Sequence, residues 1–353
     1  MSKALVAAAE AKGTIKNMYQ VMLLLEAKLC NPNGDPDMAN LPRQDMETGI
    51  GIITDCAIKR RIRNYVDAAF AGDPGMDILM RDGTSLNKEI ARAVLQANDL
   101  EAFNKKFENC QVEKSAAVMS ERFWDVRTFG GVLSTGRNAG QITGPVQVAM
   151  SESFDPIHIE DMTITRMCYT DGKECSTMGE YEAEEASRPA DKKRTMGEKK
   201  VISYGLYLVK ATISPNLAMR TGFSEADLEK LFEAMLQMYE FDNTASKQGM
   251  SVVSPLIIFK HVGTHPENPE ESAREALLGC APAHKMFRSL HVSKKEDVAY
   301  PRKLEDYDLE FEVPADVHGV EIGVKTAPFD AVIWENEQPE ALKKAMEDSG
   351  IRL

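Results

Sequence analysis

The sequence predicts an α+β fold with a ferredoxin-like βαββαβ core that carries large insertions. An apolar run at residues 18–30 predicts a core strand, and helical patterns begin near Thr54 and Ser224. Strand patterns follow each helix, which gives the order strand, helix, strands, strand, helix, strand. Sheets of the RNA-recognition-motif-like (RRM-like) type belong to this architecture, so the sequence favours one.

The first strand is expected to end in the turn-forming run NPNGDPD at residues 31–37. A helix then begins near Thr54, a good N-cap, and Asp55 suits the positive end of the helix dipole. Apolar residues recur every four positions and predict its buried stripe: Ile58, Ile62 and Val66.

Two insertions are expected between the core elements. Residues 71 to about 115 open with glycine and proline and predict a mainly helical insertion with an apolar stripe at Leu86, Ile90, Ala93, Val94 and Ala97. Strands predicted at residues 161–169 and 201–213 enclose the charge-dense stretch 170–200, which favours an exposed hairpin or loop.

The second half of the chain supplies the rest of the core. A helix is predicted from Ser224 to Glu240, with Asp227 completing a variant of the capping box. Its apolar face consists of Leu228, Leu231, Phe232, Met235 and Tyr239. Strands are predicted at residues 251–260, 307–313 and 320–324, and a short helix from about Pro339.

Composition narrows the class of protein. The chain has 353 residues, of which 43% are hydrophobic and 27% charged, as in an ordinary globular protein. No apolar run approaches the roughly 18 residues of a membrane span. Residues 1–17 predict a short helix or loose terminus of a cytoplasmic protein. The six cysteines form no CxxC pair, so idle thiols are favoured, and we expect neither a metal nor a cofactor.

Nucleotide-binding, nucleophile-elbow and zinc-protease motifs are absent from the sequence. Asp35 and Asp37 lie near Asp45 and Asp55, and such carboxylates can hold Mg²⁺. Aspartates that cap turns and helices are the favoured alternative, so no catalytic residue is assigned.

Basic residues gather locally although the net charge is −13. An acidic chain argues against nucleic-acid binding as a whole, yet phosphate contacts need only local positive charge. The first cluster follows Thr54 and contains Lys59, Arg60, Arg61 and Arg63. The second surrounds a glycine-rich stretch whose backbone can approach an anion, and it contains Arg127, Arg137, Asn138 and Gln141.

Two further basic features lie around the second insertion. Lys192, Lys193 and Arg194 follow an acidic run, and Lys199 and Lys200 come soon after. Arg166 lies within a predicted strand and can project from the sheet. A solvated helix face, a structural glycine loop, a solubilising loop and surface ion pairs remain the respective alternatives for these clusters.

Several long motifs resemble one known family, the backbone subunit of type I CRISPR complexes (Cascade), with subtype I-C the best fit. The resemblance covers residues 18 to about 300 and rests on NPNGDPD, LPRQD, TGIGIITDCAIKRRIRNYV, FGGVLSTGRNAGQITGPVQV, SFDPI and TMGEKKVISYGLYLVKATIS followed by TGFS. It implies a hand-like subunit with an RRM-like palm, a helical finger insertion and a β-hairpin thumb. The implied parts are an N-terminal segment at 1–17, the palm at 18–70, 118–168 and 201–353, the fingers at 71–117 and the thumb at 169–200.

The resemblance also implies a function. Copies would stack head to tail along a guide CRISPR RNA and present its bases to a target DNA strand, together with other Cascade subunits. A recruited helicase-nuclease, not this chain, would cut the bound target. The guide-binding residues would be the basic clusters above together with Arg43, and Met178 and Met196 are candidates for an apolar thumb wedge.

Two other functions remain open at this stage. One is a metal-dependent ribonuclease that uses Asp35, Asp37 or Asp45, because related type III backbone subunits cleave target RNA with an aspartate. The other is a self-assembling scaffold that holds no nucleic acid. A subunit that serves many guides must ignore base identity, so the backbone-binding reading predicts contacts to phosphate and ribose.

Overall fold

The computed structural model describes residues 13–103, 111–170 and 172–353, and one large antiparallel sheet organises them. Most of the N-terminal segment predicted at 1–17 lies outside the described residues. The main path of the sheet runs β16 (Ile333–Trp334), β15 (Val320–Lys325), β12 (Leu256–His261), β1 (Tyr19–Cys30), β10 (Thr195–Ile213), β8 (Ser151–Pro156) and β4 (Ile50–Ile53). Three short or lateral strands join it: β7 (Val146–Val148), β9 (Ile159–Arg166) and β11 (Met250–Val252).

Strands β1 and β10 form the centre of the sheet, paired from Tyr19 opposite Ile213 to Cys30 opposite Ile202. Side chains alternate between the two faces of a strand, so Leu23 and Met22 enter different cores. Both faces are covered, which explains why β1 is a nearly continuous apolar run.

Helices α2 (Asp55–Ala69) and α8 (Glu225–Phe241) cover one face of the sheet. Thr54 caps α2 by accepting a hydrogen bond from the Ala57 N–H at 3.3 Å, and Ser224 forms a capping box with Asp227. The apolar stripes predicted for both helices are buried, so these two predictions are confirmed. Helix α7 (Pro215–Thr221) lies between β10 and α8 in the chain, and α9 (Pro269–Leu278) follows β12.

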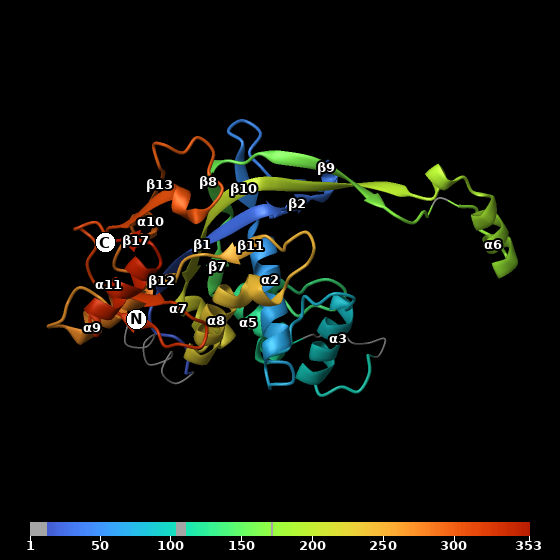
Figure 1. Cartoon of the computed structure of the whole chain (residues 1–353). Coiled ribbons are helices and arrows are strands. Elements are labelled where there is room, and N and C mark those ends of the chain that lie inside the picture. Colours follow the sequence, from blue (N-terminus) through green and yellow to red (C-terminus); the bar gives the residue numbers. More distant parts are fainter. Residues whose placement is uncertain (1–12, 104–110, 171) are drawn as a thin grey trace.

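A C-terminal layer covers the opposite face (Figure 1). It contains a small sheet and three helical segments: β13 (Leu290–Lys294), β14 (Tyr307–Phe311), β17 (Ile351–Arg352), α10 (Ala283–Phe287), η3 (Leu304–Asp306) and α11 (Pro339–Asp348). The strands predicted at residues 307–313 and 320–324 and the helix from Pro339 are confirmed, whereas β13 and β17 were not predicted. The strand expected at residues 251–260 is divided into β11 and β12.

The first insertion forms a helical lobe beside α2 (Figure 1). It consists of α3 (Leu86–Ala97), α4 (Val112–Arg122), α5 (Trp124–Phe129), β5 (Gly130–Val132) and β6 (Gln141–Thr143). Ile90, Val94 and Met119 belong to a separate small core, which the predicted stripe anticipated. Each sheet face and this lobe therefore has its own apolar cluster.

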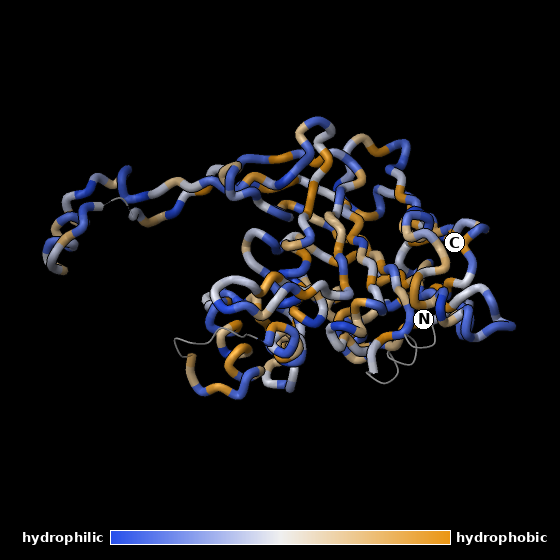
Figure 2. Tube along the Cα trace, turned by 180° about the vertical axis from the view of Figure 1, so that it is seen from behind, coloured by the Kyte–Doolittle hydropathy of each residue, from blue (hydrophilic) through white to orange (hydrophobic). Residues whose placement is uncertain are grey.

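A long arm projects from the end of the sheet that lies away from the C-terminus (Figure 1). The arm is a ribbon of β9 and the first half of β10, paired from Arg166 opposite Thr195 to Ile159 opposite Ile202. Beyond the ribbon lie α6 (Met178–Ser187) and η2 (Ala190–Lys192). Figure 2 shows that the outer arm is mainly hydrophilic, unlike the centre of the molecule.

Helix α6 corrects the prediction of a hairpin or loop at residues 170–200. Thr177 caps the helix by accepting from the Glu180 N–H at 3.3 Å, and alanine and glutamate are good helix formers. Strand β10 also begins at Thr195, six residues before the expected start at 201. In the part of the chain that the structure describes, no helix has the length and apolarity to cross a bilayer.

Candidate nucleic-acid interface

The loop at residues 31–49, which begins with NPNGDPD and is called the NPNGDPD loop here, connects β1 to β4. It includes β2 (Gly34–Asp35), η1 (Pro36–Met38) and β3 (Leu41–Pro42). The Asn33 side-chain oxygen accepts from the Thr54 N–H at 2.8 Å and the Thr54 hydroxyl at 2.9 Å. A Cβ at Gly34 would overlap the side-chain oxygen of Asn40, so a larger residue there would require the Asn40 side chain to move. The loop is thus fixed to the start of α2.

Arg43 lies on this loop, and its side chain is partly buried. Its guanidinium Nη1 donates to the Asp35 carboxylate at 2.9 Å, and its backbone N–H donates to the Asn33 carbonyl at 2.9 Å. The Arg43 side chain as a whole is one-third exposed, so an additional ligand has access to part of it.

Three of the four predicted cations on α2 already have carboxylate partners. Lys59 Nζ lies 2.9 Å from Asp55, Arg63 Nε lies 2.9 Å from Asp125, and Arg61 Nη1 lies 2.5 Å from Asp242. Each of these cationic side chains is less than one-fifth exposed. The pairing reduces the positive charge that this helix offers to a ligand.

Arg60 differs from its three neighbours. It is exposed on α2, and within the described ranges it has no ion-pair partner. Of the four cations that the sequence predicted on α2, Arg60 is therefore the one without a carboxylate partner among the described residues.

The glycine-rich stretch lies directly beside α2. Lys59 Nζ is 5.7 Å and the Arg63 guanidinium carbon 5.1 Å from the centre of the Phe129 ring, and Gly130 follows Phe129 in the chain. A Cβ at Gly130, where φ is +79°, would collide with the backbone of the paired strand β6. The structure therefore places the first predicted cluster against the start of the glycine-rich stretch.

The far side of the glycine-rich stretch carries the polar residues of the second cluster. Arg137 stacks over the Phe103 ring at 3.9 Å, and the Asn138 side chain accepts from the Gly140 N–H at 2.8 Å. Asn138 and Gln141 are exposed. These residues form one surface on the helical lobe.

Arg127 does not belong to that surface. It is 9% exposed, and its guanidinium forms two hydrogen bonds with Asp227 of α8, at 3.0 and 2.7 Å. The other N–H groups donate to the carbonyls of Ser120, Glu121 and Gly75. All five guanidinium donors are used inside the protein, which corrects the prediction that Arg127 contacts a ligand.

The arm carries the remaining predicted residues. Arg166 is exposed at the end of β9, and Lys192, Lys193 and Arg194 precede Thr195 on the returning side. Met178 and Met196 are 72% and 75% exposed, but Met178 belongs to α6 and Met196 to the ribbon. The structure places both methionines and all four cations on the projecting part.

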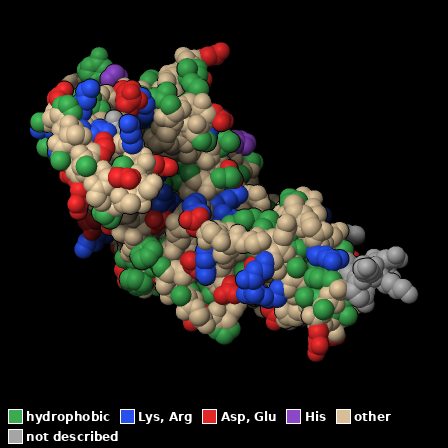
Figure 3. All heavy atoms as spheres, turned by 90° about the vertical axis from the view of Figure 1, so that its right-hand side faces the viewer, with side chains coloured by type: hydrophobic (Ala, Val, Ile, Leu, Met, Phe, Trp, Pro, Cys, Tyr) green, Lys and Arg blue, Asp and Glu red, His purple; other side chains and the backbone are tan. Residues whose placement is uncertain are grey.

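The arm and the helical lobe extend on the same side of the body, and the space between them is called the recess here. Figure 1 shows β2 directly beneath the ribbon, with α2 and α3 below it, and Figure 2 shows the same space from behind. Figure 3 faces this side and shows lysine and arginine side chains gathered toward the hollowed middle and over the lower lobe. Basic side chains are therefore present on the side of the molecule from which the arm and the lobe extend.

Sequence reasoning did not assign Lys247, which also borders these elements. Its ammonium donates to the Asn31 carbonyl at 2.5 Å and to the Pro32 carbonyl. Burial lowers the pKa of Lys247 to about 8. A single lysine between α8 and β11 gives no pattern in the sequence, so only the fold reveals this position.

The predicted metal-binding aspartates have structural partners. Asp35 accepts from the Asp37 N–H and from Arg43, and Asp45 accepts from the Glu47 N–H and the Thr48 hydroxyl. These are the contacts of residues that cap turns. Within the described residues, no group of three or more histidine, cysteine, aspartate or glutamate side chains is arranged to hold a metal ion.

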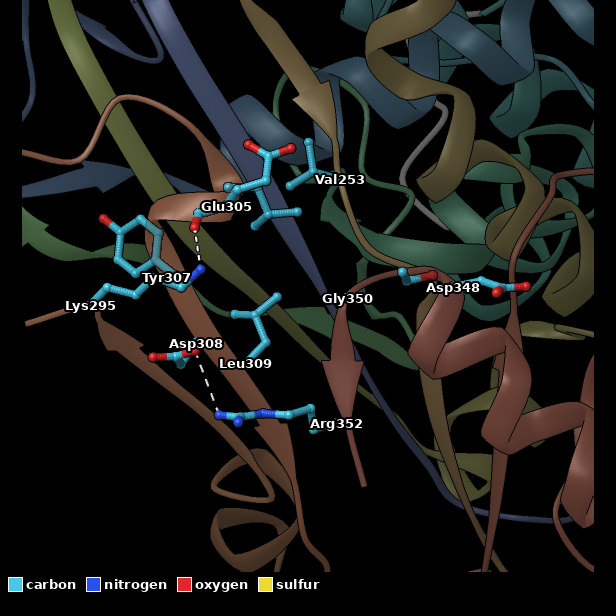
Figure 4. Close-up of a pocket in the computed structure, with 11 residues that line it drawn as sticks. Val253, Lys295, Glu305, Tyr307, Asp308, Leu309, Asp348, Gly350 and Arg352 are labelled. Atoms are coloured by element: carbon cyan, nitrogen blue, oxygen red, sulfur yellow. Dashed lines mark hydrogen bonds and ion pairs between the residues drawn. The ribbon is translucent and has the colours of Figure 1, made fainter. Parts of the chain in front are cut away.

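A separate pocket of about 550 Å³ opens in the C-terminal layer, between β14, β17 and the end of α11. Figure 4 shows Arg352 reaching toward Asp308, and their charged groups lie 3.6 Å apart. None of the predicted ligand-binding residues lines this pocket. It therefore lies apart from the recess beneath the arm.

Comparison with known proteins identifies relatives. The family model described as CRISPR-associated protein Cas7 matches residues 17–312. The CRISPR-associated protein Cas7 of Haloferax volcanii is 27% identical over 241 residues, which span 62% of this chain and 63% of the relative. The chain therefore matches less than two-thirds of that relative's length.

Two solved structures are also similar. A chain of a CRISPR RNA-guided surveillance complex, pre-nicking, has a TM-score of 0.41 and 15% identity over 75% of this chain and 84% of that one. A chain of a CRISPR RNA-guided surveillance complex has a TM-score of 0.36 and 12% identity over 69% and 68%.

Proposed function

Because this chain belongs to the CRISPR-associated protein Cas7 family, we propose that it binds guide RNA as a non-catalytic backbone subunit of a Cascade complex of the I-C lineage. The family match over residues 17–312 is the observation that carries the proposal. The complex would be a cytoplasmic ribonucleoprotein, and this subunit would contribute the repeated protein framework along the RNA.

The palm of this subunit is an RRM-like sheet in our proposal. In support, four strands lie in the order β12-β1-β10-β8, all antiparallel, and this is the ferredoxin-like arrangement. Helix α2 precedes β8 and α8 precedes β12 in the chain, as that architecture requires. The part of the helical lobe at 71–117 would be the fingers, and the part of the arm at 169–200 the thumb; the rest of the lobe, from α5 to β6, falls in the segment 118–168 assigned to the palm.

The guide would lie in the recess beneath the arm. Arg60 and Arg166 are exposed, and neither has an ion-pair partner in the described residues, so both are ready to meet phosphates. Arg43 from the loop, Arg137, Asn138 and Gln141 from the lobe, and Lys192, Lys193 and Arg194 from the arm would contribute further contacts to the same guide. Lys59, Arg61 and Arg63 would mainly hold α2 in place through their carboxylates.

Contacts of this kind do not distinguish bases. Guanidinium and ammonium groups bind phosphate oxygens in any sequence, and the exposed methionines of the arm can pack against a displaced base of any type. A subunit built this way can carry any guide. The bases would remain available for pairing with a target DNA strand.

The arm suits contact with a neighbouring copy. It extends beyond the body of its own subunit, and α6 has no buried residue in this chain. A head-to-tail interface of this type is heterologous and continues along the RNA. Other Cascade subunits would end the filament, and a recruited helicase-nuclease would cut the bound target.

The direct test is to purify the assembly and extract its nucleic acid. We expect a discrete short RNA and an absorbance ratio well above that of protein alone. An assembly that contains no polynucleotide would overturn this proposal and favour a scaffold that holds no nucleic acid.

The same purified assembly also distinguishes this proposal from the alternative of a metal-dependent ribonuclease. Incubation with matched RNA and Mg²⁺ should leave the RNA intact. Cleavage that is abolished by Asp35→Ala, Asp37→Ala or Asp45→Ala would assign the chain to the nucleases instead.

A further inference from the structure

The segment that joins α8 to β11, residues 242–249, connects three parts of the molecule and is called the strap here. Asp242 pairs with Arg61 of α2 at 2.5 Å. The Ser246 carbonyl accepts from the Asn31 N–H at 2.9 Å, and the Ala245 carbonyl accepts from Lys199 Nζ at 3.0 Å. The strap therefore meets the helix, the NPNGDPD loop and the base of the arm.

Two lysines at the strap have only carbonyl partners. Lys247 donates to the carbonyls of Asn31 and Pro32, and Lys199 donates to that of Ala245. In the described parts of the chain, neither ammonium has a carboxylate within ion-pair distance. Each ammonium has three N–H donors, so at least one remains available on Lys247 and two on Lys199.

The groups that face Lys247 do not supply negative charge. Arg61 approaches it from α2 and opposes its charge. Cys30 approaches from β1, and burial raises the pKa of the Cys30 thiol to about 11, so the thiol is neutral at neutral pH. Lys199, from β10, is also close enough to Cys30 to act on that thiol. The site is therefore positive overall.

Other enclosed cations of this chain show the contrast. Lys59, Arg63 and Arg127 each contact a carboxylate within 3.0 Å, and Lys325 lies 3.6 Å from Glu229. Removing a cation from water is costly unless an anion or several dipoles replace the water. Lys247 is enclosed and lacks such an anion, and the more exposed Lys199 beside it also has none, which points to one supplied from outside.

We propose that Lys199 and Lys247 bind one phosphodiester group of a single-stranded RNA at the strap. The hydroxyls of Thr244 and Ser246, whose oxygens lie 3.2 Å apart on the exposed side, provide further donors to the same anion. Phosphate oxygens accept such hydrogen bonds without regard to the base. This inference rests on the proposed function and adds a site to it.

The position of Lys199 gives this site a second role. Lys199 belongs to the ribbon of β9 and β10, whereas Lys247 contacts the loop after β1. An anion shared by the two lysines ties the base of the arm to the sheet. Binding of RNA at the strap would thus fix the direction in which the arm points.

The test uses the full-length chain and a short, labelled single-stranded RNA of mixed sequence. Lys199→Gln and Lys247→Gln should each weaken binding about tenfold and reduce the salt slope by roughly 1. Lys260→Gln is the matched control, because Lys260 is similarly enclosed but paired with Glu321, and it should leave both quantities unchanged. Lys247→Arg should retain binding.

The outcomes are distinguishable. If the unmodified chain binds RNA and both glutamine variants bind it equally well, the strap site is wrong. If the unmodified chain binds no RNA, the proposed function fails. Thermal unfolding in the presence of inorganic phosphate then tests whether the strap binds an anion, independently of RNA. Phosphate should then raise the Tm of the unmodified chain but not that of Lys199→Gln, which alters an exposed contact and leaves the fold intact. An equal rise in both proteins would overturn the proposal.

Discussion

At the scale of single residues, Arg60 and Arg127 show how differently one fold treats two arginines that the sequence presents alike. Arg60 extends into solvent, whereas Arg127 is enclosed and has every donor occupied. The difference arises from partners that are distant in sequence, above all Asp227, one hundred residues away. Local sequence can therefore identify a cluster of cations but not which of them are neutralised.

The first prediction concerns Arg127. Arg127→Met should lower the free energy of unfolding by about 3 kcal/mol, because it leaves the buried carboxylate of Asp227 without its partner. Denaturant unfolding measures this loss. Arg60→Met is the control and should leave stability unchanged while it weakens RNA binding. Equal stability of the two variants would show that the Arg127 pair does not join the lobe to the palm.

The second prediction concerns pH. Burial lowers the pKa of Lys247 to about 8, so its charge is present below that pH and lost above it. A bound phosphate stabilises the charged form, so affinity for RNA should fall as the pH rises through about 8. The expected loss is about tenfold, equal to one charge-assisted hydrogen bond. Lys247→Arg, which stays charged, should remove the dependence, and a dependence retained by that variant would assign the titration elsewhere.

At the scale of elements, the local patterns predicted well wherever one residue type repeats on a buried face. Strand β1, helix α2 and helix α8 lie within a few residues of their predicted positions, because caps and apolar stripes are local signals. The small sheet of β13, β14 and β17 depends on pairing between distant segments. Strands β13 and β17 therefore could not be found from the sequence.

Helix α6 was missed for a different reason. Its residues are polar and none is buried, so it has no apolar stripe to reveal its period. The Thr177 cap and the glutamate-rich composition were the available signals. They were outweighed by the expectation that an exposed, charge-dense stretch forms a loop.

The third prediction concerns the arm. Replacing residues 167–194 with a short Asn-Gly turn should preserve the fold, because Arg166 and Thr195 are paired directly and α6 packs against no core. The Tm should stay close to that of the unmodified chain. Loss of this outer part of the arm should abolish cooperative assembly on RNA, which sedimentation or electron microscopy would measure. Assembly that continued in this variant would contradict a role for the outer arm between subunits.

At the scale of the whole molecule, a net charge of −13 coexists with basic side chains on the side from which the arm and the lobe extend. Internal ion pairs use up many of the basic residues, so the free ones have effect only where the fold gathers them. Excess acidic surface elsewhere would disfavour stray nucleic acid and meet basic surfaces of neighbours. The sequence could locate clusters of basic residues, whereas it could not show which cations are free and which are paired.

The central claim is that the subunit holds the sugar-phosphate backbone and ignores the bases. The most direct measurement compares the unmodified chain with an Arg60→Ala, Arg166→Ala variant on several guides of unrelated sequence, each over a range of salt concentrations. The account predicts the same fractional loss of affinity for every guide and a salt slope reduced by roughly 2, one for each phosphate contact removed. A loss that varied with guide sequence, or a slope that did not change, would contradict it.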